Sequence, residues 1–204
     1  MLDAHQIVLL HDQATARWHE ASFRDPAPIT QWDTLILDQH RANFDLWHHE
    51  DAARDPHASD REIAAHKHAI DTLNQRRNDL AEQMDTLLLA ATPPPDETVP
   101  LHSETPGMMI DRLSILALKR FHTEEETRRA DASAAHRERN QARLTILDHQ
   151  RSDLADCLDA LWQDILSGCR RFKLYRQLKM YNDPDLNPVL YRKAPVETFG
   201  SGES

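Results

Sequence analysis

Hydrophobic residues recur every three or four positions along most of this chain, which is the period of a helix with one buried face. The pattern is clearest over residues 60–91 and 133–166, where leucine and isoleucine carry it. The first stretch places apolar side chains at Ile63, Ile70, Leu73, Leu80, Met84 and Leu87. Both stretches are therefore predicted to form long amphipathic helices.

Prolines and capping residues mark three further helices. Their expected ranges are residues 2–22, 33–54 and 105–129. Asp33 suits the N-cap of the second helix, whereas Thr105 and Pro106 suit the cap and the first position of the fourth. Five helices with mostly short connections predict an all-α, up-and-down helical bundle.

One connection is long and rich in proline. Residues 92–100 read TPPPDETVP, and we expect them to cross the bundle as a loop. Neither side of this loop carries enough amphipathic helix to close a bundle by itself, so we expect a single domain over residues 1–193. Residues 194–204 are expected to form a flexible tail.

The composition agrees with a helical protein and narrows its partners. Only 4 of the 204 residues are glycine and 6% are aromatic, which disfavours turns and strands. The net charge of -10 argues against nucleic-acid binding over most of the surface. No apolar run approaches the roughly 18 residues of a membrane span, and Cys157 and Cys169 do not suggest a disulfide framework. We therefore expect a cytoplasmic protein with no membrane span.

The predicted second helix carries polar and aromatic residues along one stripe. His40, Asn43, Trp47 and Glu50 follow one another at steps of three or four residues, so they share a face. Such a face suits ligand binding, with His40 as an acid–base group. The alternative is a solvated face from which Trp47 dips into the core.

The predicted third helix has a similar stripe at the edge of its apolar face. This stripe lies within about 80° of arc and consists of Asp71, Asn74, Asn78, Glu82 and Asp85. Asparagine is a poor helix former, so its presence indicates a role other than solubility. The carboxylates would hold Mg²⁺ or Mn²⁺, which prefer oxygen ligands, although Glu-x-x-Asp spacing is also common by chance. We expect Arg77 to pair with one of these acids.

The predicted fourth helix begins at a turn suited to anion binding. Gly107 leaves N–H groups and the positive end of the helix dipole free to receive a phosphate. Farther along, Asp111, Lys119 and His122 are expected on one face, with Arg112 beside them. This combination suits phosphate chemistry, with Asp111 and His122 as catalytic groups. The alternative is a surface ladder of ion pairs.

The segment over residues 170–193 is locally basic. It holds seven lysines and arginines against two aspartates, interleaved with aromatic residues. Arg176 and Lys179 are expected to hold phosphate beside the acidic pocket, within about 15 Å of Asp71 and Asp111. Alternatively, the segment neutralises the acidic remainder of the protein.

The thirteen histidines show no spacing typical of a zinc site. His48 and His49 are adjacent, and His66 and His68 are expected to point to different sides of one helix. From the sequence alone, no zinc site is predicted.

The chain resembles an uncharacterised bacterial family, the domain of unknown function 4254. The resemblance extends over nearly the whole length and rests on HRANFDLWHHED (40–51), IDTLNQRRNDLAEQMD (70–85), SETPGMMIDRLSILALK (103–119) and YRQLKMYNDPDLNPVLY (175–191). Members often occur encoded near glycosyltransferases of the cell envelope, which implies activated sugars as a context. A weaker similarity to all-α nucleotide pyrophosphohydrolases rests on Glu50-Asp51 and Glu82-x-x-Asp85, and it implies Glu50 as a further metal ligand. The chain lacks that family's first motif, Glu-Glu-x-x-Glu.

Two hypotheses follow. In the first, the protein is a metal-assisted enzyme acting on a phosphorylated or nucleotide-linked sugar, and its stripes converge on one cavity lined by His40, Glu50, Asp71, Asn78, Asp111 and Lys119. In the second, it is a non-catalytic helical binding or scaffold protein whose polar stripes form buried hydrogen-bond networks. The sequence does not decide between them.

Overall fold

A computed structural model describes residues 2–20, 30–94, 96–178 and 184–191. Five long helices dominate it: α1 (Ala4–Trp18), α2 (Gln31–Ala52), α3 (Asp60–Ala90), α4 (Pro106–Arg128) and α5 (Ala134–Leu166). A single-turn helix, α6 (Pro188–Tyr191), follows. The described part of the chain contains no β-strand, so the predicted all-α bundle is confirmed. The predicted tail at 194–204 lies outside the described residues.

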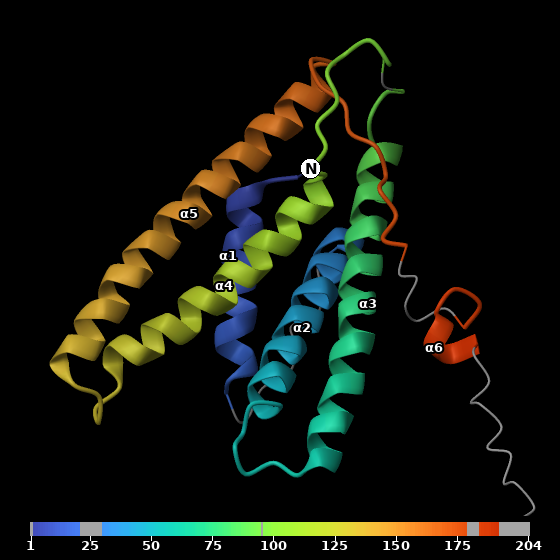
Figure 1. Ribbon diagram of the computed structural model, residues 1–204. Coiled ribbons are helices and arrows are strands. Elements are labelled where there is room, and N and C mark those ends of the chain that lie inside the picture. The colour runs from blue at the N-terminus through green and yellow to red at the C-terminus, as the bar shows by residue number, and fades with distance from the viewer. Residues whose placement is uncertain (1, 21–29, 95, 179–183, 192–204) are drawn as a thin grey trace, which may run out of the picture.

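The helices form two hairpins with α1 between them (Figure 1). Helix α2 packs mainly against α3, α4 packs mainly against α5, and α1 contacts α2, α4 and α5. The most enclosed apolar side chains come from both hairpins and include Ile36, Met84, Ile110, Leu113 and Leu158, each at most 1% exposed. Burying these side chains is the main force that holds the hairpins together.

Local capping sets the helix boundaries, and the two largest differences from the prediction are at the end of α1 and the start of α2. Helix α1 ends at Trp18 with His19 as its C-cap, four residues before the predicted end. Helix α2 is capped by Thr30, whose Oγ1 accepts a hydrogen bond from the backbone N–H of Asp33 at 3.0 Å. Asp33 therefore lies in the first turn, where its charge complements the helix dipole.

The segment after α5 holds the connection between α3 and α4 in place. Arg171 forms an isolated parallel bridge with Leu101, and its guanidinium donates to the carbonyls of Val99 and Glu97. The next residue, Phe172, is buried in the core. The connection thus lies beside the end of α5, whereas its crossing of the bundle stays a prediction.

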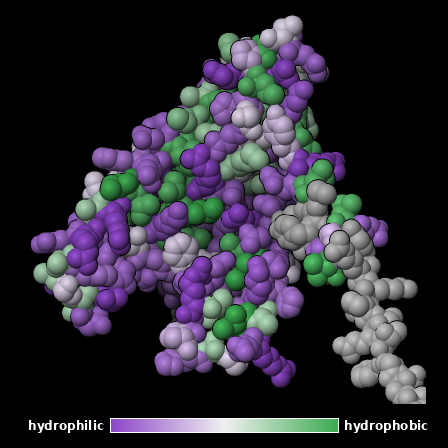
Figure 2. Space-filling view, viewed as in Figure 1, coloured by the Kyte–Doolittle hydropathy of each residue, from purple (hydrophilic) through white to green (hydrophobic). Residues whose placement is uncertain are grey.

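The face of the molecule seen in Figure 2 is largely polar, with hydrophobic side chains in several separate patches among the hydrophilic ones. Among the described residues, no helix combines the length and apolarity needed to cross a membrane.

Candidate functional site

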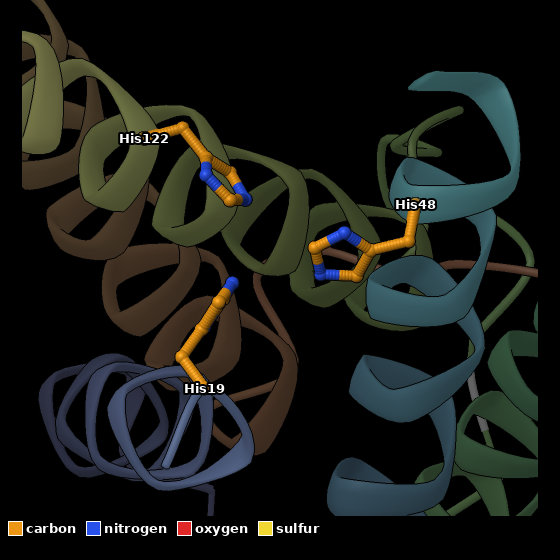
Figure 3. Close-up of side chains that lie close together, drawn as sticks. All are labelled: His19, His48 and His122. Carbon is orange, nitrogen blue, oxygen red and sulfur yellow. The ribbon is translucent and has the colours of Figure 1, made fainter. Parts of the chain in front are cut away.

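Three histidines from three separate elements converge near one end of the bundle (Figure 3). His19 caps α1, His48 lies near the end of α2, and His122 lies in the second half of α4. One ring nitrogen from each lies within 4.8 Å of the other two, and this is the one such group of potential metal ligands in the described ranges. A His₃ set with an open position is the ligand arrangement of several catalytic zinc sites.

The hydrogen bonds of two of these rings determine which nitrogen is free to bind an ion. The Nδ1 of His122 lies 2.9 Å from a carboxylate oxygen of Glu125, and the Nδ1 of His19 lies 2.8 Å from the carbonyl oxygen of Thr15. Both oxygens only accept, so each Nδ1 carries the proton and each Nε2 presents its lone pair. This pattern, with a carboxylate or carbonyl behind the ligand, is typical of metal-binding histidines.

His122 adds a second indication. Its Nε2 is buried and has no hydrogen-bond partner in the part of the chain that the structure describes. A buried nitrogen without a partner costs free energy, and a bound ion would remove that cost.

His48 is also prepared to act as a neutral ligand. Burial and the nearby rings of His19 and His122 lower the pKa of His48, against the opposing charges of Asp51 and Asp45. Each of the three rings packs on an aromatic neighbour: His122 on Trp47 at 4.9 Å, His19 on Phe121 at 4.3 Å and His48 on Phe44 at 4.5 Å between centroids. These contacts orient the three imidazoles before any ion binds.

A pocket of about 420 Å³ adjoins the cluster on the side of α4 and α5. His122 and Trp47 line it together with two cationic side chains, Lys119 and Arg143. Arg143 donates to the Oδ1 of Asn140 at 3.1 Å, and Lys119 is exposed. A small anionic molecule in this pocket would lie beside His122.

A separate buried hydrogen-bond network joins α1, α2 and α4. His40 is 0% exposed; its Nε2 donates to the carbonyl of His11 at 3.1 Å and lies 2.8 Å from Thr15 Oγ1, while its Nδ1 lies 2.7 Å from Ser114 Oγ. Ser114 Oγ also accepts a hydrogen bond from Asn43 at 2.9 Å. Both nitrogens of His40 are thus occupied, and no solvent reaches the ring.

Asp111 closes this network at the edge of α3. Its Oδ1 accepts hydrogen bonds from Gln39 at 2.5 Å and Asn43 at 2.9 Å. Arg77 donates to Asn43 at 3.3 Å and lies 4.0 Å from the other carboxylate oxygen of Asp111. Arg77 therefore pairs with an acid of α4, not with one of the α3 stripe.

His40, Asn43 and Asp111, which the sequence placed at a ligand site, thus come together, but as a structural network. His40 is enclosed, and its role as an acid–base group stays a prediction. Asp111 remains 18% exposed at its side chain and keeps some access to solvent.

The four predicted metal-binding carboxylates are spread along the molecule. Asp71 and Asp85 lie fourteen residues apart on one continuous helix, which is about 21 Å of rise. Asp71 pairs with Lys67 at 2.9 Å and Glu50 with Arg54 at 2.6 Å, while Glu82 accepts the backbone N–H of Gln177 at 2.7 Å. These carboxylates therefore do not form one ligand set, and binding of Mg²⁺ or Mn²⁺ stays a prediction.

Asp85 occupies the place expected for a phosphate. Its carboxylate accepts hydrogen bonds from Gly107 N–H at 2.7 Å and Thr105 Oγ1 at 2.5 Å, at the start of α4. Burial raises the pKa of Asp85 to about 6, although both hydrogen bonds oppose this rise. The anion preference of this helix terminus is thus met by the protein's own side chain.

The residues expected on one face of α4 lie on two sides of the helix, because their spacing in the sequence does not match the helical period. At 100° per residue, His122 lies about 20° from Asp111 around the helix, whereas Lys119 lies about 80° away. His122 consequently faces α1 and α2, and Lys119 faces the α4–α5 side, where it also lines a second groove with Arg112. Arg112 pairs with Glu104 at 2.6 Å.

The remaining ligand residues are distributed as follows. Asn74 and Asn78 are half-buried on α3, and Arg176 is exposed. The segment holding Arg176 runs along α3 in Figure 1, where its neighbour Gln177 contacts Glu82. Lys179 lies outside the described residues. The structure therefore separates the six residues expected in one cavity: Asp71 and Glu50 are in surface ion pairs, and Lys119 is on the α5 side.

Sequence reasoning missed the histidine cluster. Zinc motifs are recognised by short spacing within one segment, but these ligands lie 29 and 74 residues apart, on different elements. The one signal in the sequence was that His48, next to Trp47, and His122 each lie near the end of a predicted helix.

Comparisons with known proteins give one match. A family model described as "Protein of unknown function (DUF4254)" matches residues 33–174. This range covers α2 to α5, including His48 and His122, whereas His19 precedes it. Neither the curated proteins nor the solved structures show a match.

Proposed function

The chain belongs to the DUF4254 family of proteins of unknown function, and we propose that it is a metal-assisted enzyme acting on a phosphorylated small molecule. The ion would be held by His19, His48 and His122. The observation that carries this proposal is the convergence of three imidazole nitrogens, two with their tautomer set for binding by Glu125 and Thr15.

Imidazole ligands favour Zn²⁺ and related transition ions over Mg²⁺. Ions of this kind lower the pKa of a bound water toward neutrality and so supply a hydroxide nucleophile. His19 is exposed, so a substrate reaches the cluster from the surface.

The adjoining pocket supports an anionic substrate. Lys119 and Arg143 supply positive charge beside His122, and Trp47 supplies an apolar wall. A nucleotide-linked sugar combines phosphate with groups that pack on an aromatic ring, and this is the substrate class we propose.

Metal binding is the first prediction. Adding Zn²⁺ to chelator-treated protein at about 100 times its Kd should stabilise the fold by about 2.7 kcal/mol, which is a rise in melting temperature of several degrees. His122→Ala should abolish this rise, and Glu125→Gln should weaken Zn²⁺ binding about 10- to 100-fold because it removes the carboxylate behind the ligand. The matched control is His57→Ala, since His57 is an exposed histidine outside the cluster.

The same titration with Mg²⁺ and Mn²⁺ tests the ion expected from the sequence. A rise in melting temperature with Mg²⁺ or Mn²⁺ that persists in His122→Ala would indicate that the ion binds the carboxylates and not the histidines. Equal Zn²⁺ effects on the parent and on His122→Ala would contradict the proposal.

Substrate binding is the second prediction. A nucleoside diphosphate sugar should bind the Zn²⁺-loaded protein, and replacing Lys119 and Arg143 together with alanine should weaken that binding at least 10-fold, since two phosphate contacts are lost. Isothermal titration measures the affinity. Release of the sugar phosphate, with the nucleoside monophosphate as the other product, measures turnover. Lys67→Ala serves as the control, because Lys67 lies on the outer face of α3.

The buried network around His40 favours a second candidate function, a non-catalytic scaffold. Fully paired polar groups in a core fix the relative position of helices. Metal binding without turnover of any phosphorylated compound, and with no effect of the Lys119 and Arg143 substitutions, would favour this alternative.

A further inference from the structure

Outside the three-histidine cluster, a pair of histidines lies in a groove between α2 and α3. The groove has a volume of about 660 Å³, and four histidines line it: His48, His49, His66 and His68. His48 belongs to the cluster described above, whereas the other three have no part in the proposed function.

His49 and His66 face each other across this groove. Their Nδ1 atoms lie 2.9 Å apart, and their ring centroids lie 5.2 Å apart with the planes tilted by 54°. Both side chains are half-buried, and the α2–α3 hairpin packing holds them opposite each other.

Two nitrogens at this distance have two chemical interpretations. One ring donates an N–H to the other, or both present lone pairs to a shared ion. Two nitrogens bound at about 2.1 Å to one Cu²⁺ ion, at the right angle of a square-planar site, lie about 3 Å apart, which matches the observed spacing. In a tetrahedral Zn²⁺ site they lie about 3.4 Å apart, so the two rings would separate by about 0.5 Å. The donating ring needs only to move its proton from Nδ1 to Nε2, so the exchange requires no net proton loss.

A carboxylate lines the groove but is not a third ligand of this pair. Asp45 precedes His49 by one turn of α2, and its carboxylate pairs with Arg41 at 2.8 Å. The ligand atoms of Asp45, His49 and His66 do not all lie within 4.8 Å of one another, so the site would consist of two imidazoles and water.

We infer that His49 and His66 form a second transition-metal site, binding Zn²⁺ or Cu²⁺ through their Nδ1 atoms, with water in the remaining positions. This site is independent of the His19, His48 and His122 cluster, because it uses different ring atoms from different residues. It opens into the groove that His48 also lines.

Zn²⁺ stoichiometry tests the inference. Equilibrium dialysis followed by metal analysis should give two ions per chain for the parent and one for His66→Ala. His68→Ala is the matched control, since His68 lines the same groove but is exposed, and it should keep both ions. The His19, His48, His122 triple alanine variant should also keep one ion, and adding His66→Ala should remove it. Far-ultraviolet circular dichroism confirms that each variant is folded.

The variants separate failure of this site from failure of the proposed function. One ion in the parent that depends on His122 and not on His66 would overturn the inference and leave the first site standing. One ion that depends on His66 and not on His122 would support the inference and contradict the metal site of the proposed function. As a second readout, Cu²⁺ added to the triple variant should show nitrogen couplings in its electron paramagnetic resonance spectrum that disappear with His49→Ala.

Discussion

Lowering the pH from 7 to 5 is expected to destabilise the folded protein, by about 2 kcal/mol through His40 alone, because two histidines are buried without charge. His11 and His40 are both 0% exposed, and their rings stack at 4.4 Å between centroids. Burial lowers the pKa of His40 from 6.5 to about 3, against the hydrogen bond to the His11 carbonyl. Burial, then the charges of His40 and Arg151, lower the pKa of His11 well below 6.5.

The free energy of unfolding decreases as the pH falls if the unfolded state binds more protons than the folded state. Between pH 6.5 and about 3 the unfolded chain protonates His40 while the folded chain does not, so stability falls as the pH falls through this window. His40 alone costs about 2 kcal/mol between pH 7 and 5, and His11 adds a loss of the same sign. Asp85 acts in the opposite direction, since its pKa is raised to about 6. Its protonation in the folded state stabilises the protein by about 1 kcal/mol between pH 7 and 5.

Urea unfolding at pH 7 and pH 5, followed by tryptophan fluorescence, measures this loss. His11→Phe should make stability fall less steeply as the pH is lowered, because it keeps a stacked ring but cannot bind a proton. His57→Gln, at an exposed position, should leave the pH dependence unchanged. Equal stability of the parent at both pH values, or an unchanged slope in His11→Phe, would contradict the prediction.

Replacing Gly107 with alanine is expected to destabilise the fold by about 3 kcal/mol and to lower the melting temperature by about 10 °C. A Cβ at this position would overlap the backbone carbonyl oxygen of Ala81 and would lie 2.9 Å from Asp85 Cγ. The overlap forces α3 and α4 apart where Asp85 binds the start of α4. The better helix propensity of alanine, worth about 1 kcal/mol, does not offset this cost.

Thermal unfolding of Gly107→Ala and of two companion variants tests this account. Gly168→Ala is the control, because a Cβ there has nothing within 4 Å and only the positive φ of 72° opposes it, at about 1 kcal/mol. Gly107→Ala in an Asp85→Ala background should show no rescue, since the overlap with the Ala81 backbone remains. A melting temperature of Gly107→Ala equal to that of the parent would show that the helices are not in close contact here.

The sequence by itself determined the helices and the fold class. Helix boundaries depend on local periodicity and caps, so α3, α4 and α5 were predicted to within one residue at each end. The start of α2 was missed by a few residues because Thr30 and Asp33 are both good capping residues, and only the backbone geometry distinguishes them. Of the three stripes predicted to converge on one cavity, those of α2 and α4 meet at Asn43 and Asp111.

Only the tertiary structure decided which of those polar residues are covered and which of them lie together. Helical phase indicates which side chains share a face, but not whether that face is covered, and α1 covers His40. A stripe along one helix extends 1.5 Å per residue, so Asp71 and Asp85 share a face and still cannot share an ion. His19, His48 and His122 form a group only through the packing of three helices, and no local pattern encodes that packing.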